Sequence, residues 1–112
     1  MTTRLTVVPT ESSTYVVQVV FTNEDGTAVV PSAITWSLTD KLGAAVNSRT
    51  DVAVGSPAST INIVLSGLDL ALSGYAGPER ILTVEATYTS ALGAGLPLKG
   101  AAWFVVEPLV AV

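Results

Sequence analysis

Apolar and polar side chains alternate along three stretches of the chain, with the period of two that is typical of β-strands. In the range 33–40, isoleucine, tryptophan and leucine occupy one face, while threonine and serine occupy most of the other. The ranges 59–65 and 80–89 repeat this alternation. Each stretch therefore predicts a strand with one buried face and one solvated face.

The range 14–22 differs from these three because it is largely apolar on both faces. One row contains tyrosine, valine and phenylalanine, and the other contains Val16 and Val20 around Gln18. We predict a strand here whose second face is also covered, either by the rest of the chain or by a partner.

Shorter apolar runs complete the set of predicted elements. The ranges 4–8 and 101–107 predict the first and last strands, and a further short strand is expected at 44–47 or at 51–54. The range 66–73, with leucine at every second position from 68 to 72, is compatible with a single helical turn that crosses between sheets.

Glycine and proline mark the connections between these elements. The sequences Asn23–Gly26, Asp40–Gly43 and Leu92–Gly95 each predict a tight hairpin turn with glycine in the left-handed conformation. Pro31 and Pro97 are expected at strand entrances, where a missing N–H removes no ladder hydrogen bond. Such turns between short strands predict an all-β fold, a single immunoglobulin-like β-sandwich of about seven antiparallel strands.

The chain has 112 residues and a mass of 11.5 kDa, which fits one domain over residues 1–112. It contains no cysteine and no histidine, which excludes thiol nucleophiles, imidazole bases and the usual zinc sites. The acidic residues are scattered singly, and most, including Asp40 and Asp69, are expected in turns or on solvated faces rather than in a catalytic pair. We therefore expect a protein that is not an enzyme, with no cofactor and no metal.

Charge and hydropathy exclude two classes of partner. The net charge of −4 argues against binding to nucleic acid, which normally needs a basic patch. The mean hydropathy of +0.57 is high, but the chain lacks the run of about 20 apolar residues that a membrane-spanning helix needs. The N-terminal residues contain no apolar core of a signal peptide, so we expect no export signal and synthesis in the cytoplasm.

Apolar side chains exceed what one small core requires, and such a surplus on a soluble chain usually marks a protein contact. It includes Val16, Val20, one face of the range 103–106 and the uncharged tail after Pro108. We expect the tail, 108–112, to bind a partner by adding a strand to its sheet edge; the alternative is that the tail folds back as the domain's own edge strand. The residues expected at this contact are Arg4, Leu109, Val110 and Val112.

Two parts of the chain carry a family resemblance. The first is Ile34–Asp40 with Gly43 and Val46–Asn47, and the second is Ile61–Leu70 with Arg80–Tyr88, Leu96–Lys99 and Phe104–Val106. Over residues 14–107 the chain resembles the small immunoglobulin-like structural proteins of tailed-phage virions. The absence of a cysteine pair departs from antibody-type domains and agrees with domains that fold in reducing cytoplasm.

The resemblance implies a structural protein of the virion, present in many symmetric copies and bound to the major capsid protein or to tail proteins. Our first expectation is a head decoration or cement protein, and the alternative within this class is a tail or neck component. An alternative from another class is a carbohydrate-binding or adhesion module with weak contact to host-surface glycans. Trp36 and Trp103 are the candidate sugar platforms, but Trp36 is in register with core positions. A third alternative is a fragment of a larger bacterial surface protein.

Overall fold

The computed structural model describes residues 2–109 and contains seven strands and one short helix. The strands are β1 (Thr2–Arg4), β2 (Thr14–Val20), β3 (Ala33–Asp40), β4 (Val52–Ala53), β5 (Thr60–Ser66), β6 (Glu79–Ser90) and β7 (Gly93–Val105). The helix η1 (Gly67–Leu70) is one turn of 3-10 helix directly after β5, inside the range where a helical turn was expected. The all-β prediction is confirmed.

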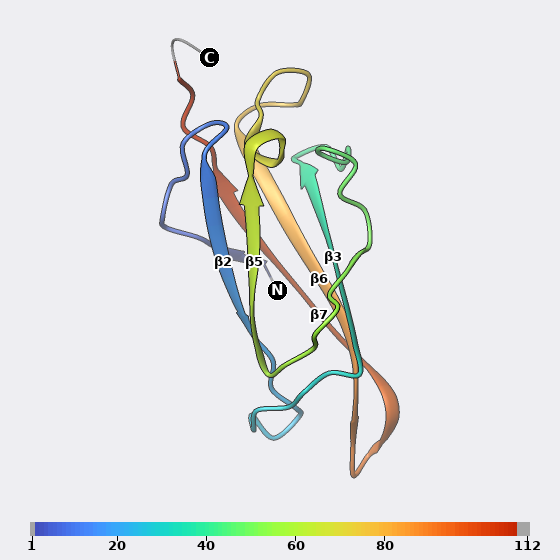
Figure 1. Ribbon diagram of the computed structural model, residues 1–112. Coiled ribbons are helices and arrows are strands. Elements are labelled where there is room, and N and C mark those ends of the chain that lie inside the picture. The colour runs from blue at the N-terminus through green and yellow to red at the C-terminus, as the bar shows by residue number, and fades with distance from the viewer. Residues whose placement is uncertain (1, 110–112) are drawn as a thin grey trace.

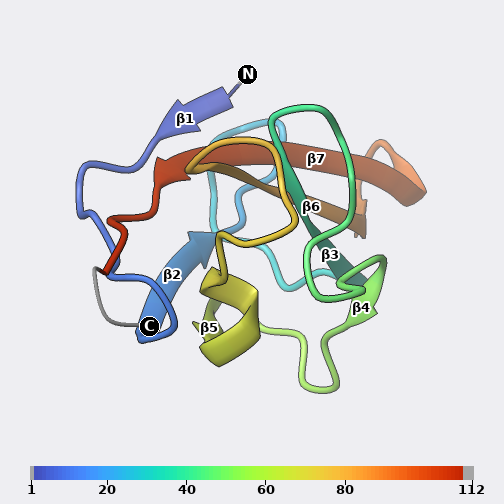
Figure 2. The same cartoon turned by 90° about the horizontal axis from the view of Figure 1, so that it is seen from above.

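The strands form two sheets that pack face to face. One sheet has five strands in the order β1-β7-β6-β3-β4, and the other contains β2 and β5 alone. Figure 1 shows β2 and β5 in front of the larger sheet, and Figure 2 separates the two layers from above. Because β3, β6 and β7 share one sheet while β2 and β5 share the other, the arrangement is a two-layer β-sandwich.

The first strand differs from the prediction in position and direction. The sequence predicts a strand at 4–8, whereas β1 covers Thr2–Arg4 and pairs in parallel with Ala101–Trp103 of β7. The N–H of Leu5 still donates to the carbonyl of Trp103, at 2.8 Å, but Thr6 to Val8 leave the sheet as an exposed segment. All other strand pairs are antiparallel, so one pair in the larger sheet departs from the predicted antiparallel set.

The last strand, β7, begins earlier than predicted. Its first residues include glycine and proline, which the sequence pattern assigns to a turn and to a strand entrance. The predicted strand covers 101–107, whereas β7 starts at Gly93, and Pro97 lies inside it opposite Thr87. A proline is tolerated there because β1 covers the outer side of β7 only from Ala101 onward. The hairpin turn between β6 and β7 is consequently shorter than the predicted Leu92–Gly95 turn.

The other two predicted hairpin turns also form: one lies in a connection between the two sheets, and the other lies between β3 and β4, which are neighbours in the larger sheet. In the first, Asn23 Oδ1 accepts the N–H groups of Asp25 and Thr27, and Gly26 has a φ of 79°. This turn lies in the connection between β2 and β3, which belong to different sheets. The turn after Asp40 closes with an isolated bridge between Thr39 and Ala45, and β4 follows as a separate short strand. Of the two ranges in which a short strand was expected, 44–47 therefore contains a single bridge and 51–54 contains β4.

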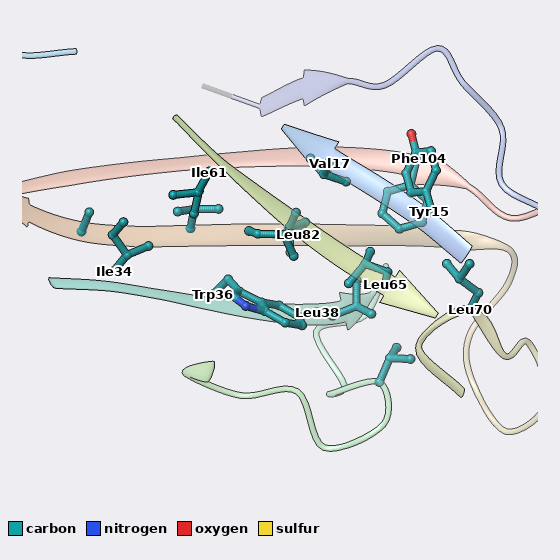
Figure 3. Close-up of a cluster of buried hydrophobic side chains, with 14 of the residues drawn as sticks. Tyr15, Val17, Ile34, Trp36, Leu38, Ile61, Leu65, Leu70, Leu82 and Phe104 are labelled. Carbon is teal, nitrogen blue, oxygen red and sulfur yellow. The ribbon is translucent and has the colours of Figure 1, made fainter. Parts of the chain in front are cut away.

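The core lies between the two sheets and is built from the inward-facing row of each strand (Figure 3). Trp36 is buried, as predicted, together with the inward residues of β2 and β5. The rings of Tyr15 and Phe104 meet across the layers with their centroids 5.0 Å apart. The residues that are fully shielded include Leu38, Val46, Leu65, Leu70, Phe104 and Val106.

Candidate functional site

The outer face of the two-stranded sheet is exposed and carries no charge. We call it the β2–β5 face. It consists of the outward side chains Thr14, Val16, Gln18 and Val20 of β2 and Thr60, Asn62, Val64 and Ser66 of β5. The three valines are 52%, 59% and 54% exposed, in chain order. The second face of β2, which the sequence predicts to be covered, is therefore not covered by any of residues 2–109.

Both strands of this sheet also have a free edge. Within the described chain, β2 pairs only with β5 and β5 only with β2. The ends of their ladder fix which backbone groups are paired: the N–H of Phe21 donates to Ser59, and the N–H of Gly67 donates to Ser13. Because paired residues alternate along an antiparallel ladder, the odd-numbered residues of β2 bond to β5 and the even-numbered residues turn their N–H and C=O groups to the free side.

Two hollows run along the free edge of β2. One, of about 320 Å³, separates the second half of β2 from Leu5 and from Leu98–Ala102 of β7. The other, of about 350 Å³, separates the first half of β2 from the segment Leu5–Val7. The side of the sandwich between β2 and β7 is therefore open, and the backbone edge of β2 borders this opening.

The structure places the predicted contact residues at separate points. Arg4 is exposed on β1, with its guanidinium 4.9 Å from the centre of the Trp103 ring. Leu109 is 48% exposed, and its N–H donates to Glu11 Oε1 at 3.0 Å. Val110 and Val112 lie outside the described residues.

The chain before the tail is fixed to its own domain. The N–H of Val106 donates to the carbonyl of Pro78, and the N–H of Glu107 donates to the carbonyl of Pro9. The N–H of Glu11 donates back to the carbonyl of Glu107, at 2.8 Å. These bonds fix the chain as far as Glu107, whereas the two alternatives for the tail, 108–112, concern residues that mostly lie outside the described ones.

A buried carboxylate joins two loops at one end of the sandwich. Asp69 is 1% exposed, whereas the sequence predicts a solvated residue, so that prediction is wrong. Its Oδ1 accepts hydrogen bonds from Arg49 Nε at 2.8 Å and Asn47 Nδ2 at 2.9 Å, and its Oδ2 accepts the N–H of Ser66 at 3.1 Å. Burial alone would raise the pKa of Asp69, but the hydrogen bonds from Arg49, Asn47 and Ser66 outweigh it and hold the pKa below its ordinary value.

A second buried pair of charges lies where β3 ends and β6 begins. Asp40 is 3% exposed, so the expectation of a solvated carboxylate is wrong here as well. Its oxygens accept the N–H groups of Ala76, Ala44 and Leu42, which lower the pKa of Asp40. Arg80, its cross-strand neighbour, is fully buried.

The guanidinium of Arg80 is held by backbone carbonyls. Its Nη1 donates to Gly77 and Glu79, and its Nη2 donates to Ala71. Burial lowers the pKa of Arg80, while the nearby negative charge of Asp40 opposes this effect. These contacts tie the segment 71–79 to the start of β6.

The buried charges therefore have a structural role. The carboxylate oxygens of Asp40 and Asp69 accept protein N–H groups from three residues each, so neither is positioned as a free acid or base. No group of three or more acidic, cysteine or histidine side chains within 2–109 is arranged to hold a metal ion. The same residues include no helix that is long and apolar enough to cross a membrane.

No protein-family model matches this chain, and comparisons with curated proteins and with solved structures find no match either. A functional assignment therefore depends on the chain's own residues. Of its surfaces, the β2–β5 face and the open edge beside it combine exposed apolar side chains with unpaired backbone groups, and we take them as the candidate site.

Proposed function

We propose that this chain is a structural protein that binds other proteins through its β2–β5 face in an assembly of many copies. The observation that carries the proposal is this face itself, with exposed Val16, Val20 and Val64 and no charged side chain on either strand. A chain with a net charge of −4 gains solubility from charge on its surface, so an uncharged apolar face is costly unless a partner covers it.

The assembly that we propose is the virion of a tailed phage, in which the chain decorates the head. This assignment extends the family resemblance of the sequence and is supported by the sandwich architecture and by the structural role of the buried charges. A rigid sandwich bound in many copies would strengthen a protein shell by adding many small apolar contacts, without a catalytic reaction. A tail or neck position requires the same kind of surface and is the alternative outcome of the test below.

The test is co-sedimentation of the purified chain with undecorated phage heads and, separately, with isolated tails. We expect stoichiometric binding to heads. Val64→Lys places a charge at the centre of the β2–β5 face and should abolish binding, whereas Thr35→Lys, on the outer side of the opposite sheet, is the matched control and should not. Binding to tails alone would move the assignment to a tail component, and binding to neither would overturn the proposal.

Deletion of residues 108–112 tests the predicted contribution of the tail. The segment before it is held by backbone hydrogen bonds to Pro78 and Pro9, so the shortened chain should remain folded. Loss of head binding by this folded variant would assign the contact to the tail. Unchanged binding would remove Leu109, Val110 and Val112 from the proposed site and leave the β2–β5 face.

A further inference from the structure

The exposed row of β2 reads the same in both directions. Along the chain it is Thr14, Val16, Gln18 and Val20, and two residues beyond the end of β2 it continues to Thr22, which forms an isolated bridge with Ala28. Gln18 therefore stands at the centre of a palindrome of side chains. These five residues are all exposed. They are also the residues whose backbone N–H and C=O groups face the free edge, because the odd-numbered residues bond to β5.

We propose that the free edge of β2 binds the same edge of a second copy of this chain, in antiparallel pairing about a two-fold axis at Gln18. Gln18 then faces its own copy, each Val16 faces a Val20, and each Thr14 faces a Thr22. Valine pairs and threonine pairs are favourable cross-strand neighbours, and two glutamine amides can donate and accept reciprocally. A two-fold axis requires this kind of self-complementary surface, in which residue i contacts j and j contacts i.

Charge favours a second copy on this edge over other parts of the surface. The chain has a net charge of −4, so two copies repel each other wherever acidic groups meet. None of the five residues in the palindromic row is charged. The edge of β2 is therefore a surface on which two acidic copies can approach without placing like charges opposite each other.

Space and geometry also agree with an added strand. The hollows of about 320 and 350 Å³ border β2 over its whole length, and across the second one the segment Leu5–Val7 faces the first half of β2. An added strand would therefore lie between this segment and β2. Figure 2 shows the connection between β1 and β2 passing on the side of β2 that faces away from β5. Pairing converts two sheets of two strands each into one sheet of four strands in the order β5-β2-β2-β5 and removes two exposed edges, which are otherwise sites of uncontrolled association.

This inference rests on the proposed function, since both assign the β2–β5 sheet to protein contacts. The paired form joins two β2–β5 faces into one continuous uncharged surface, which would then dock on the assembly. The dimer is weak if the strand pairing is its main contact, because stable interfaces usually bury about 800 Å² on each partner. Many copies on a shell compensate for weak individual contacts.

The experiment is sedimentation velocity of the purified chain over a wide concentration range, with charge-swapped variants at the axis. The wild-type chain should pass from monomer to dimer as concentration rises. Gln18→Lys and Gln18→Glu each place like charges opposite each other and should remain monomeric. An equimolar mixture of the two should form a heterodimer at lower concentration than the wild type forms a dimer, which also shows that both variants are folded.

Val64→Lys is the matched control for the dimer. Val64 lies directly opposite Val16 on the same sheet, is exposed to a similar extent and is one strand further from the axis. This variant should dimerise nearly as well as the wild type. A wild-type chain that stays monomeric, a Gln18→Lys chain that still dimerises, or a mixture that does not associate would each overturn the inference.

Comparison with head binding separates this inference from the proposed function. If the wild-type chain stays monomeric but binds heads, the edge pairing is wrong and the docking function stands. If dimers form with the expected charge dependence but bind neither heads nor tails, the pairing stands and the proposed function is wrong.

Discussion

Replacement of Asp69 by asparagine should destabilise the fold strongly although it changes almost no volume. The carboxylate accepts hydrogen bonds from Arg49, Asn47 and Ser66. Asparagine offers one acceptor oxygen, so either the Ser66 N–H or the other two donors must face an NH₂ group. Hydrogen bonds to a charged group contribute about 1.5–3 kcal/mol each, and an unsatisfied buried donor costs about 1–3 kcal/mol.

Solvent access limits part of this loss. The Arg49 side chain is 39% exposed, so its guanidinium can turn toward water when the carboxylate is removed. The losses at Asn47 and Ser66 remain, and the free energy of unfolding should therefore fall by about 2–4 kcal/mol. This is a large fraction of the stability of a small domain, which is typically about 5–15 kcal/mol.

Urea denaturation followed by tryptophan fluorescence measures the effect, with Asp51→Asn as the matched control. Asp51 is an exposed aspartate in the loop that contains Arg49, and its carboxylate accepts no hydrogen bond from the described residues. Its replacement should change the free energy of unfolding by no more than about 0.5 kcal/mol. Equal effects of the two substitutions would refute the assignment of a structural role to Asp69.

The pH dependence gives a second, independent check. The pKa of Asp69 is lowered in the folded chain, so folding favours the charged form. The stabilisation is present above the unfolded-state pKa, near 3.8, and is lost as the pH falls through the lower folded-state value. The stability difference between the wild type and Asp69→Asn should therefore shrink as the pH falls below about 3.8. A difference that is constant down to strongly acidic pH would show that the charge is not the cause.

Two further predictions concern the burial pattern and the second charge cluster. Leu65→Ala should lower the free energy of unfolding by about 3–5 kcal/mol, because Leu65 is fully buried. Val64→Ala, one residue earlier and 54% exposed, should lower it by less than about 1 kcal/mol, and equal unfolding midpoints would contradict the inward and outward assignment of β5. The pKa of Asp40 is lowered first by the N–H of Ala76 and also by the charge of Arg80. In a folded Arg80→Met chain this pKa should therefore rise toward its ordinary value. A carboxyl NMR titration that finds no rise would show that Arg80 does not act on Asp40.

The main strands follow from alternation alone. A period of two assigns each residue of β3, β5 and β6 to one face, and only one of the two sets is apolar enough for the core. For β2, both sets are apolar, and the surplus on the second face indicates a contact outside the domain. The structure leaves Val16 and Val20 exposed, in agreement with that surplus.

The burial of the charged residues does not follow from their type, because an aspartate or arginine is usually solvated and only its position in the fold can bury it. Asp69 stands three residues after Ser66, the spacing of a capping box, and the structure forms that box at η1. Arg80 lies two residues before Leu82, on the inward row of β6. Both signals are present in the sequence, but the partners Arg49 and Asp40 come from other loops and strands, and only the fold brings them together.

The free edge of β2 depends on information of yet another kind. A sequence pattern shows which side chains of a strand share a face, but the order of strands in the sheets decides which edges remain unpaired. The palindrome around Gln18 has meaning only once the even-numbered residues are known to turn their backbone groups away from β5. Hydrophobic patterning can therefore indicate that this domain has a partner, whereas the hydrogen-bonding register is needed to infer that the partner is a second copy.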